Sequence, residues 1–380
     1  MFKNRLTPIL FALFIIVPAL TYLLAYYTDW LFFVETGFAS VFTTKLYAQT
    51  GIGVLFGGLL FAFLVPNLLY ANRAEFPHAG EYIEAGAIRL QRNQTLPMIR
   101  PIGVLIAAGI ALFVGQFGAL QWENVLLFIN RVSVGTTDPV IGKDIGFYLF
   151  SLPLLEILRG YLNFMLLATL LVTLLVYYIR GGIALTLRGL LIAQQVRRHT
   201  AILLALFSCV IAAGFYLEGF GLLYGNKGAF YGAGYVDVNV RLTTLTTLAF
   251  ITPVAGLLLA FGLWKGTWRL VLLPPIVVVA AYMIGMRGYP ALLQKFKVAP
   301  NELALETPYI EHNINFTRFG YDLKKIETVP FDVDTRLSAA EIANNDATIK
   351  NIRLWDHAPL LKTYSQLQQI RTYYKFFDVD

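Results

Sequence analysis

Long runs of apolar residues, separated by short polar stretches, occupy the first three quarters of the chain. A membrane-spanning helix needs about 20 mostly apolar residues. Seven runs reach this length, and the prolines inside several of them are compatible with kinked helices whose neighbours satisfy the freed carbonyl groups. The predicted spans are 6–27, 48–70, 102–120, 154–179, 200–217, 246–264 and 270–287. The pattern therefore predicts a membrane all-α fold, a seven-transmembrane-helix bundle over residues 1–287.

Residues 288–380 lack such runs and read as a mixed α/β segment, the start of a larger extracytoplasmic domain. Thr307-Pro308 is typical of a helix start, and Ser338 with Glu341 forms a capping-box pattern. The other predicted elements are a strand over 348–355, a helix from Pro359 and a strand over 374–380. Because an unpaired strand exposes backbone groups, we expect either a truncated product or an edge that another chain covers.

Composition supports a membrane protein. Hydrophobic residues make up 57% of the chain and charged residues 14%, with a mean hydropathy of +0.62. Soluble domains carry about a quarter charged residues, so a soluble enzyme, a disordered protein and a coiled coil are excluded. Up to Arg287 there are 19 Lys and Arg against 11 Asp and Glu, whereas the remainder has 11 against 12. Anionic lipid headgroups are the expected counter-charge; the tail has no basic stripe, so we expect no nucleic-acid partner.

Loop charges predict the orientation, because cytoplasmic loops are enriched in Lys and Arg. With the N-terminus inside, the inner segments carry 12 of these residues and the outer loops 5. Seven spans then place the segment from Gly288 outside. The apolar run at the N-terminus is longer than the core of a signal peptide, so we interpret it as an uncleaved first helix.

Three connecting segments have their own character. Residues 29–45 are aromatic and suit the headgroup zone. Residues 180–199 combine Leu and Ile with Arg188, Arg197 and Arg198, which indicates a helix lying on the inner leaflet. Residues 219–235 are rich in Gly and aromatic residues, and we interpret 226–228 as a turn because no phosphate-binding spacing occurs there.

Candidate chemistry in the spans is sparse. Their middles carry no ionisable residue, and such residues usually mark an ion or proton path. Glu156 and Arg159 are the nearest exception; three positions apart, they share a helix face, which predicts a structural ion pair near the outer interface, with a transport or binding role as the alternative.

No cofactor, metal site or catalytic residue is expected. The four histidines, His78, His199, His312 and His357, are too dispersed for a metal motif and are interpreted as surface or helix-end residues. Cys209 is the only cysteine, so no disulfide forms within the chain. Hydrolase, metalloprotease and P-loop motifs are all missing from the sequence.

Several blocks of the sequence resemble the UPF0182 family of bacterial membrane proteins. They are residues 30–42 (WLFFVETGFASVF), 138–153 (DPVIGKDIGFYLFSLP), 298–318 (VAPNELALETPYIEHNINFTR), 351–356 (NIRLWD) and 366–380 (QLQQIRTYYKFFDVD). The resemblance implies seven membrane helices in the bacterial cytoplasmic membrane and a large extracytoplasmic domain that continues past Asp380. It transfers no catalytic or binding residue.

The second of these blocks also has a physical interpretation. Asp138-Pro139 favours a turn, Gly142 and Gly146 permit a tight backbone, and Phe147-Tyr148 leads into the fourth span. We interpret this segment, with Asp138, Asp144, Phe147 and Tyr148, as a docking loop for the outer domain; ligand binding is the alternative.

Three functions remain open. The first is an integral membrane scaffold that anchors the outer domain in an envelope assembly, with the lipid bilayer and other membrane subunits or further copies of the chain as partners. The second is a transporter or channel for a neutral or lipid-like substrate. The third is an enzyme acting on envelope lipid or glycan, which would need clustered acid–base groups. The candidate carboxylates are Glu123, Asp138, Asp144, Glu156 and Asp237.

Overall fold

The computed structural model describes residues 6–74, 76, 82–85, 88–186, 189–226, 231–331, 336–353 and 356–368. Seven of the described helices are long and apolar enough to cross a membrane, and each contains one predicted span. Their main helices are α1 (Leu6–Glu35), α2 (Ala39–Asn72), α3 (Arg92–Leu120), α5 (Leu152–Arg180), α6 (Gln194–Gly221), α7 (Leu242–Lys265) and α8 (Trp268–Met283). The architecture is that of a multi-pass, all-α membrane protein, as predicted.

The helices extend beyond the apolar runs. Only residues 36–38 separate α1 from α2, so the aromatic segment 29–45, predicted to be a loop, is largely helical. A short helix, α4 (Trp122–Ile129), follows α3. A π-helical turn, η1 (Phe147–Ser151), leads into α5, so the fourth span begins at Phe147. Hydrophobicity marks the part of a helix inside the lipid, whereas backbone hydrogen bonding continues into the headgroup zone.

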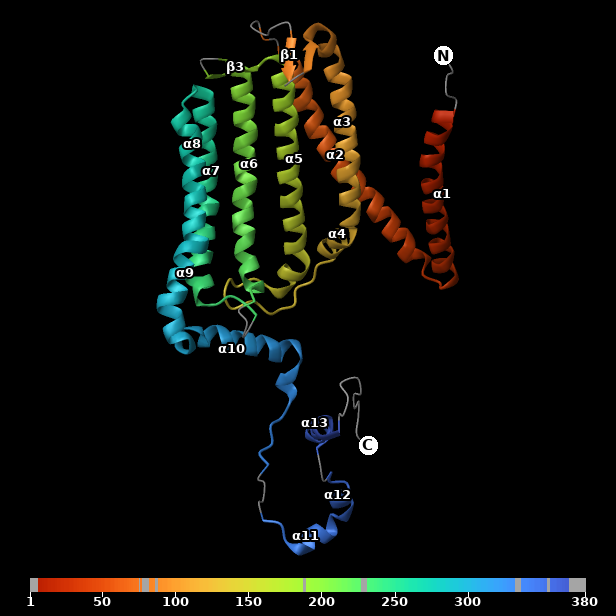
Figure 1. Ribbon diagram of the computed structural model, residues 1–380, viewed down its shortest axis with the longest axis vertical. Helices are drawn as coiled ribbons and strands as arrows, with labels where there is room; N and C mark the ends of the chain where they lie inside the picture. Colours follow the sequence, from red (N-terminus) through yellow and green to blue (C-terminus); the bar gives the residue numbers. More distant parts are fainter. Residues whose placement is uncertain are drawn as a thin grey trace. The chain divides into compact units, whose positions relative to one another are not determined.

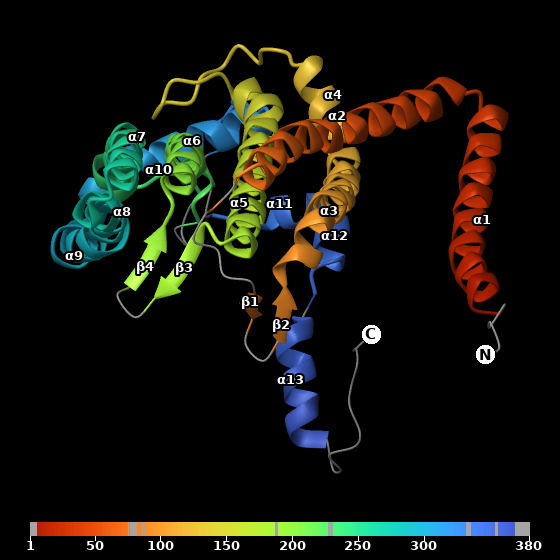
Figure 2. The same cartoon turned by 90° about the horizontal axis from the view of Figure 1, so that it is seen from above.

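Six of the membrane helices stand in a row in which each packs mainly on its neighbours (Figures 1 and 2). The order along the row is α3, α2, α5, α6, α7 and α8, while α1 contacts α2 near the turn that joins them. The row leaves many large apolar side chains exposed on its faces, as expected for helices that meet lipid.

Small residues hold α2 and α3 close together. A Cβ added at Gly57 would lie 2.6 Å from the carbonyl oxygen of Ala111, and one at Gly53 would lie 3.0 Å from that of Gly115. In contrast, a Cβ at Gly58 would meet nothing within 4 Å. Such small-residue contacts let membrane helices approach closely enough for van der Waals packing to hold them together.

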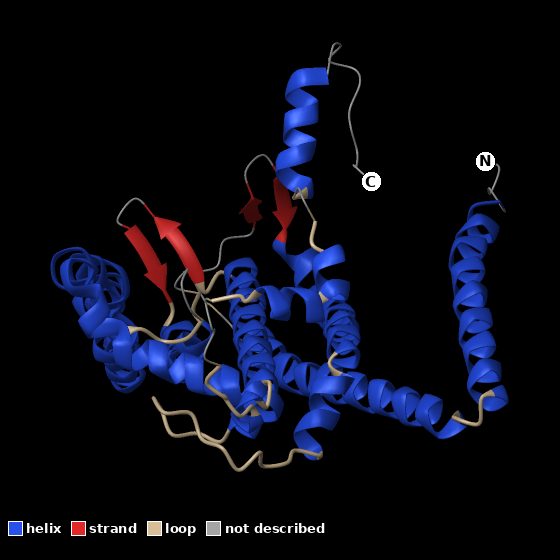
Figure 3. Cartoon of the chain, turned by 90° about the horizontal axis from the view of Figure 1, so that it is seen from below, coloured by secondary structure: helices blue, strands red, loops and turns tan. Residues whose placement is uncertain are grey.

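Two β-hairpins lie at one end of the row, called here the hairpin end (Figures 1 and 3). They pair β1 (Tyr82–Ala85) with β2 (Ile88–Gln91) and β3 (Ile183–Thr186) with β4 (Gly189–Ile192), both antiparallel. The prediction of a surface helix over 180–199 is therefore wrong. Gly181 ends α5 with a φ of 84°, which glycine adopts readily, and the following Leu- and Ile-rich residues pair as strands.

The opposite end, called the loop end, carries residues 131–146 and 222–241 together with the continuation of α8. This continuation passes through short π-helical and 3₁₀ turns before its final helix. Its parts are η4 (Ile284–Gly288), α9 (Tyr289–Leu293), η5 (Gln294–Val298), η6 (Ala299–Asn301) and α10 (Glu302–Gly320). Helix α10 lies across the loop end (Figure 1). It begins at Glu302, before the predicted start at Thr307-Pro308.

The chain divides into two compact units, Met1–Thr317 and Arg318–Asp380. The described part of the second unit contains η7 (Leu323–Lys325), α11 (Ala339–Asn344), α12 (Asp346–Lys350) and α13 (His357–Gln368). The Ser338–Glu341 capping box is present and opens α11, and α13 contains the predicted helix from Pro359.

The mixed α/β prediction for residues 288–380 is wrong for the described residues, which contain no strand. Residues 346–350, which overlap the predicted strand over 348–355, are helical, and an ion pair between Lys350 and Asp346 one turn apart supports the helix. The predicted strand over 374–380 lies outside the described residues. The predicted domain boundary at residue 288 stays a prediction.

Candidate functional site

The carboxylate of Asp138 organises the loop that precedes η1. One oxygen accepts hydrogen bonds from the backbone N–H groups of Val140 (2.9 Å) and Ile141 (2.6 Å). The other accepts from the N–H of Lys143 (2.8 Å) and from the hydroxyl of Tyr148 (2.7 Å). Asp138 is 6% exposed, so its carboxylate is a buried centre around which the backbone turns.

Asp144 plays the same part in the other half of the loop. Its oxygens accept hydrogen bonds from the Ser133 hydroxyl (2.8 Å) and from the N–H groups of Val134 (3.1 Å), Gly135 (2.9 Å) and Gly146 (2.7 Å). A Cβ at Gly146 would collide with the carbonyl oxygen of Val132. The close turn predicted at this glycine is therefore required by the backbone.

The hydrogen bonds stabilise the ionised form of both acids. Burial raises the pKa of Asp138, but the donors from Ile141, Tyr148, Lys143 and Val140 together bring that pKa below its ordinary value of 3.8. The Ser133 hydroxyl and the backbone donors likewise lower the pKa of Asp144. Both groups are thus anions held by fixed donors.

Aromatic side chains connect this loop to the helix row. The Phe147 ring lies 5.0 Å from that of Phe220 on α6, and Tyr148 packs against both Phe220 and Tyr224. The four predicted docking residues, Asp138, Asp144, Phe147 and Tyr148, thus lie in one continuous structure that is packed on α6. Docking of the outer domain on this loop stays a prediction.

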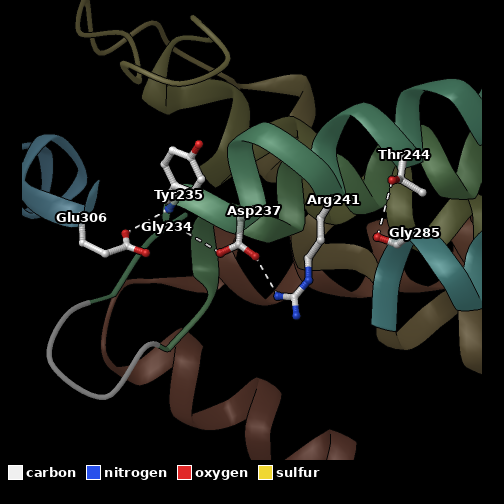
Figure 4. Close-up of polar contacts among 7 residues, drawn as sticks. All are labelled: Gly234, Tyr235, Asp237, Arg241, Thr244, Gly285 and Glu306. Atoms are coloured by element: carbon white, nitrogen blue, oxygen red, sulfur yellow. Dashed lines mark hydrogen bonds and ion pairs between the residues drawn. The ribbon is translucent and has the colours of Figure 1, made fainter. Parts of the chain in front are cut away.

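A second network at the loop end joins segments far apart in the sequence (Figure 4). Asp237, in the π-helical turn η3 (Asp237–Arg241), is 1% exposed; it accepts from the N–H of Gly234 (3.0 Å) and pairs with Arg241 (2.7 Å). Glu306 of α10 is 7% exposed and accepts from the N–H of Tyr235 at 3.0 Å. A carboxylate from α10 thus caps the turn that begins α7.

Further polar contacts fix α10 and the segment before it in the same place. Asn239 donates to the hydroxyl of Tyr309 (3.3 Å), and Asn313 donates to the carbonyl oxygen of Tyr231 (2.7 Å). The Lys297 ammonium donates to the hydroxyl of Tyr235 (2.7 Å). These residues are 62 to 82 positions apart, and sequence patterns gave no signal that they meet.

Glu156 and Arg159 form no ion pair with each other within the described part of the chain, so their pairing stays a prediction. Because the helix begins at Phe147, Arg159 lies about 18 Å along it, at 1.5 Å per residue. Its Nε is buried without a hydrogen-bond partner, as is Oδ1 of Asn163 one turn further. A Cβ at Gly214 of α6 would lie 3.0 Å from Nη1 of Arg159, so this glycine leaves room for the guanidinium.

At the hairpin end, a buried histidine joins three helices. Asn67 Nδ2 donates to the carbonyl oxygen of Phe63 (2.7 Å), so its Oδ1 accepts from Nε2 of His199 (2.8 Å). Nδ1 of His199 then accepts from the Tyr177 hydroxyl (2.9 Å). The prediction of a surface or helix-end residue is wrong for His199, which is 8% exposed. Its partners lie on α2 and α5, which the sequence alone could not place beside it.

An apolar groove of about 460 Å³ opens between α6, α7 and α8. Its two wall hydroxyls are satisfied within their own helices, Ser208 by the carbonyl oxygen of Ala205 and Thr252 by that of Leu248. The stacked rings of Phe215 and Tyr282, 5.6 Å apart, connect α6 to α8 at the end of the groove nearer the loop end. The groove therefore offers shape and apolar surface rather than hydrogen bonds.

The carboxylates considered for catalysis belong to separate structures. Asp138 and Asp144 are occupied by their own loop, Asp237 is paired with Arg241, and Glu123 lies exposed in the first turn of α4. No group of three or more His, Cys, Asp or Glu side chains that could hold a metal ion occurs in the described residues. The geometry thus gives no acid–base cluster on which an enzymatic reaction could be built.

Comparison with known proteins gives one consistent result. The family model described as "Uncharacterised protein family (UPF0182)" matches residues 6–380. A UPF0182 protein of Geobacter sp. (strain M21) is 64% identical over the whole chain, and one of Geobacter sulfurreducens is 59% identical. One of Frankia casuarinae is 33% identical over 99% of the chain. The chain covers 42%, 43% and 37% of these three proteins, less than half of each. No solved structure matches.

Proposed function

The chain belongs to the UPF0182 family, and on that basis we propose that it anchors an extracytoplasmic domain in the bacterial cytoplasmic membrane as a subunit of an envelope assembly. The buried Glu306 carboxylate carries this proposal. Through it, α10 is bonded to the start of α7 at a position 71 residues earlier. Helix α10 leads directly into the second unit. A firm attachment at this point is what an anchor requires.

The character of the loop-end contacts supports the same function. Asp237 and Glu306 are buried acids, and each accepts a backbone N–H. Removing one partner of a buried hydrogen bond to a charged group leaves the other group unpaired and costly. Such networks resist small displacements, so α10 is a rigid support rather than a flexible connection.

The Lys and Arg bias supports an orientation with the hairpin end in the cytoplasm and the loop end outside. In this orientation the two ordered loop-end networks face the envelope. Cysteine labelling in intact cells tests it, using a variant that lacks Cys209. A cysteine at exposed Gly135 should react with an impermeant reagent, and one at exposed Arg198 should not; the opposite pattern would refute this orientation.

The row of helices supports the proposed partners, which are other membrane subunits or a second copy of the chain. A closed bundle buries most of its helix surface, whereas this row has two faces with exposed Leu, Phe and Val side chains. Lipid can cover both faces, and a subunit can replace lipid on either without a change in the fold.

The full-length protein, purified from its native membrane in mild detergent, tests the proposal. We expect the wild type and Glu311→Ala to copurify with a fixed proportion of a second subunit. Glu306→Ala should lose that subunit because α10 is no longer held. Glu311 is the matched control, since it lies on the same helix but is exposed. A wild-type protein that purifies alone as a monomer, or equal subunit retention in both variants, would contradict the anchor.

The groove between α6, α7 and α8 favours a second candidate function, transport of a lipid-like substrate. Its volume lies within the roughly 300–1,000 Å³ of small-molecule sites. A bulky residue in the groove, Ala255→Trp, should abolish transfer of a fluorescent lipid by reconstituted protein. Leu257→Trp, on the exposed side of α7, is the control. Equal transfer by both variants would remove this candidate.

A further inference from the structure

One guanidinium at the hairpin end has no protein partner. Arg197 lies in the first turns of α6, and its side chain makes no hydrogen bond or ion pair with any residue that the structure describes. Its Nε is buried. An arginine remains charged in a protein, and a buried charge without a partner is costly. The side chain therefore calls for an anion from outside the chain.

Arg197 lines a pocket of about 230 Å³ between the start of α6, the end of α7, the start of α8 and β4. One water occupies roughly 30 Å³ in the liquid, so the pocket has room for a tetrahedral anion. Gly266 makes this room, because a Cβ there would collide with Nη1 of Arg197. None of the lining residues is acidic.

The neighbouring cations differ from Arg197 in having a place in the structure. Arg180 donates from Nε to the carbonyl oxygen of Ala74 (2.8 Å) and from Nη1 to Oδ1 of Asn72 (2.8 Å). The exposed Arg198 lies 6.0 Å from the ring centre of Trp264. Arg197 is thus set apart by its unmet hydrogen bonds, whereas its neighbours add only a positive field.

We propose that this pocket holds the phosphate of an anionic membrane lipid, with Arg197 as its hydrogen-bond donor. Guanidinium matches a phosphate geometrically, because two parallel N–H groups can meet two oxygens. Basic pockets between membrane helices are a known kind of site for anionic headgroups. The source of the phosphate is a lipid because Leu191, Leu263 and Val271 provide apolar walls. In addition, the half-exposed Trp264 and Trp268 mark the level of the headgroups.

The test uses the full-length chain in phosphatidylcholine nanodiscs with increasing fractions of brominated phosphatidylglycerol. Bromine quenches a nearby tryptophan, so Trp268 reports occupancy in a background where the other four tryptophans are Phe. We expect saturable quenching at a low fraction of this lipid. Arg197→Gln should weaken the apparent affinity about tenfold, the size expected for losing one charge-assisted hydrogen bond. Arg198→Gln removes the same charge one residue away and should change it less than twofold.

Further arms keep the outcome decisive. Arg197→Lys keeps the charge without the paired donors and should fall between the wild type and Arg197→Gln, while equal melting temperatures exclude a folding defect. Inorganic phosphate added to the buffer should not displace the lipid. Displacement by phosphate would overturn the lipid as the source. Quenching that rises linearly, or equal losses in Arg197→Gln and Arg198→Gln, would overturn the site, because a diffuse positive surface then explains the binding.

Discussion

Replacing Asp138 by Asn tests whether its carboxylate organises the loop before η1. Each carboxylate oxygen accepts two hydrogen bonds, and three of the four donors are backbone N–H groups. An amide keeps one acceptor and puts its own NH₂ group in place of the other oxygen. The Tyr148 hydroxyl can turn and accept from that NH₂ group, but the N–H of Lys143 cannot. At least one buried backbone donor is therefore left facing another donor.

The structure gives this change a size. A hydrogen bond to a charged group contributes about 1.5–3 kcal/mol, and every 1.4 kcal/mol is a factor of ten in an equilibrium constant. The loop in Asp138→Asn should therefore open roughly 10- to 150-fold more often. Asp138→Ala removes all four acceptor contacts and should have a larger effect.

Amide hydrogen exchange of residues 138–146 in nanodiscs measures this opening, because protected amides exchange in proportion to the open population. Glu123→Gln is the control, since that carboxylate is exposed and lies outside the loop. Tyr148→Phe should have a smaller effect than Asp138→Asn, because it leaves the three backbone contacts intact. Exchange that rises less than threefold in Asp138→Asn, or as much in the control, would refute the reasoning.

Two further predictions follow from the described geometry. Gly57→Leu should separate α2 from α3 and lower the melting temperature in detergent, because its Cβ would lie 2.6 Å from a backbone oxygen, whereas Gly58→Leu has open space; equal effects would contradict this packing. Acid should loosen the loop that Asp138 and Asp144 organise. Both pKa values are below the ordinary 3.8, so the stabilisation is complete well above pH 4 and is lost as the pH falls further. Exchange of residues 133–146 should stay constant from pH 7 to about pH 5, after correction for intrinsic rates, and rise below about pH 4; a rise already near pH 6 would point to another group.

The seven spans could be predicted because a lipid bilayer imposes a length and an apolarity that a sequence displays directly. The ends of the helices could not, since residues such as those of α4 are equally compatible with a loop and a helix. The hairpin β3–β4 was missed for a related reason. Its Leu and Ile residues fit either structure, and Gly181 with its left-handed backbone decides between them.

The predictive power for sites was equally uneven. Asp138, Asp144, Phe147 and Tyr148 were recognised as one unit because the turn they build is local. The bond from Glu306 to Tyr235 joins residues 71 positions apart, and a single sequence contains no sign of such a meeting. The exposed or buried state of a side chain such as His199 likewise depends on which helices become neighbours.

The single-file order of the helices has a consequence for biogenesis. Contacts between α5 and α6, α6 and α7, and α7 and α8 all join helices that follow one another along the chain. Each new helix leaving the insertion machinery therefore finds its docking partner already in the bilayer. The pairing of α2 with α5 is the main exception, because α2 must wait in the lipid while two later helices are made. A chaperone or insertase acting on this protein would have most to do during that interval.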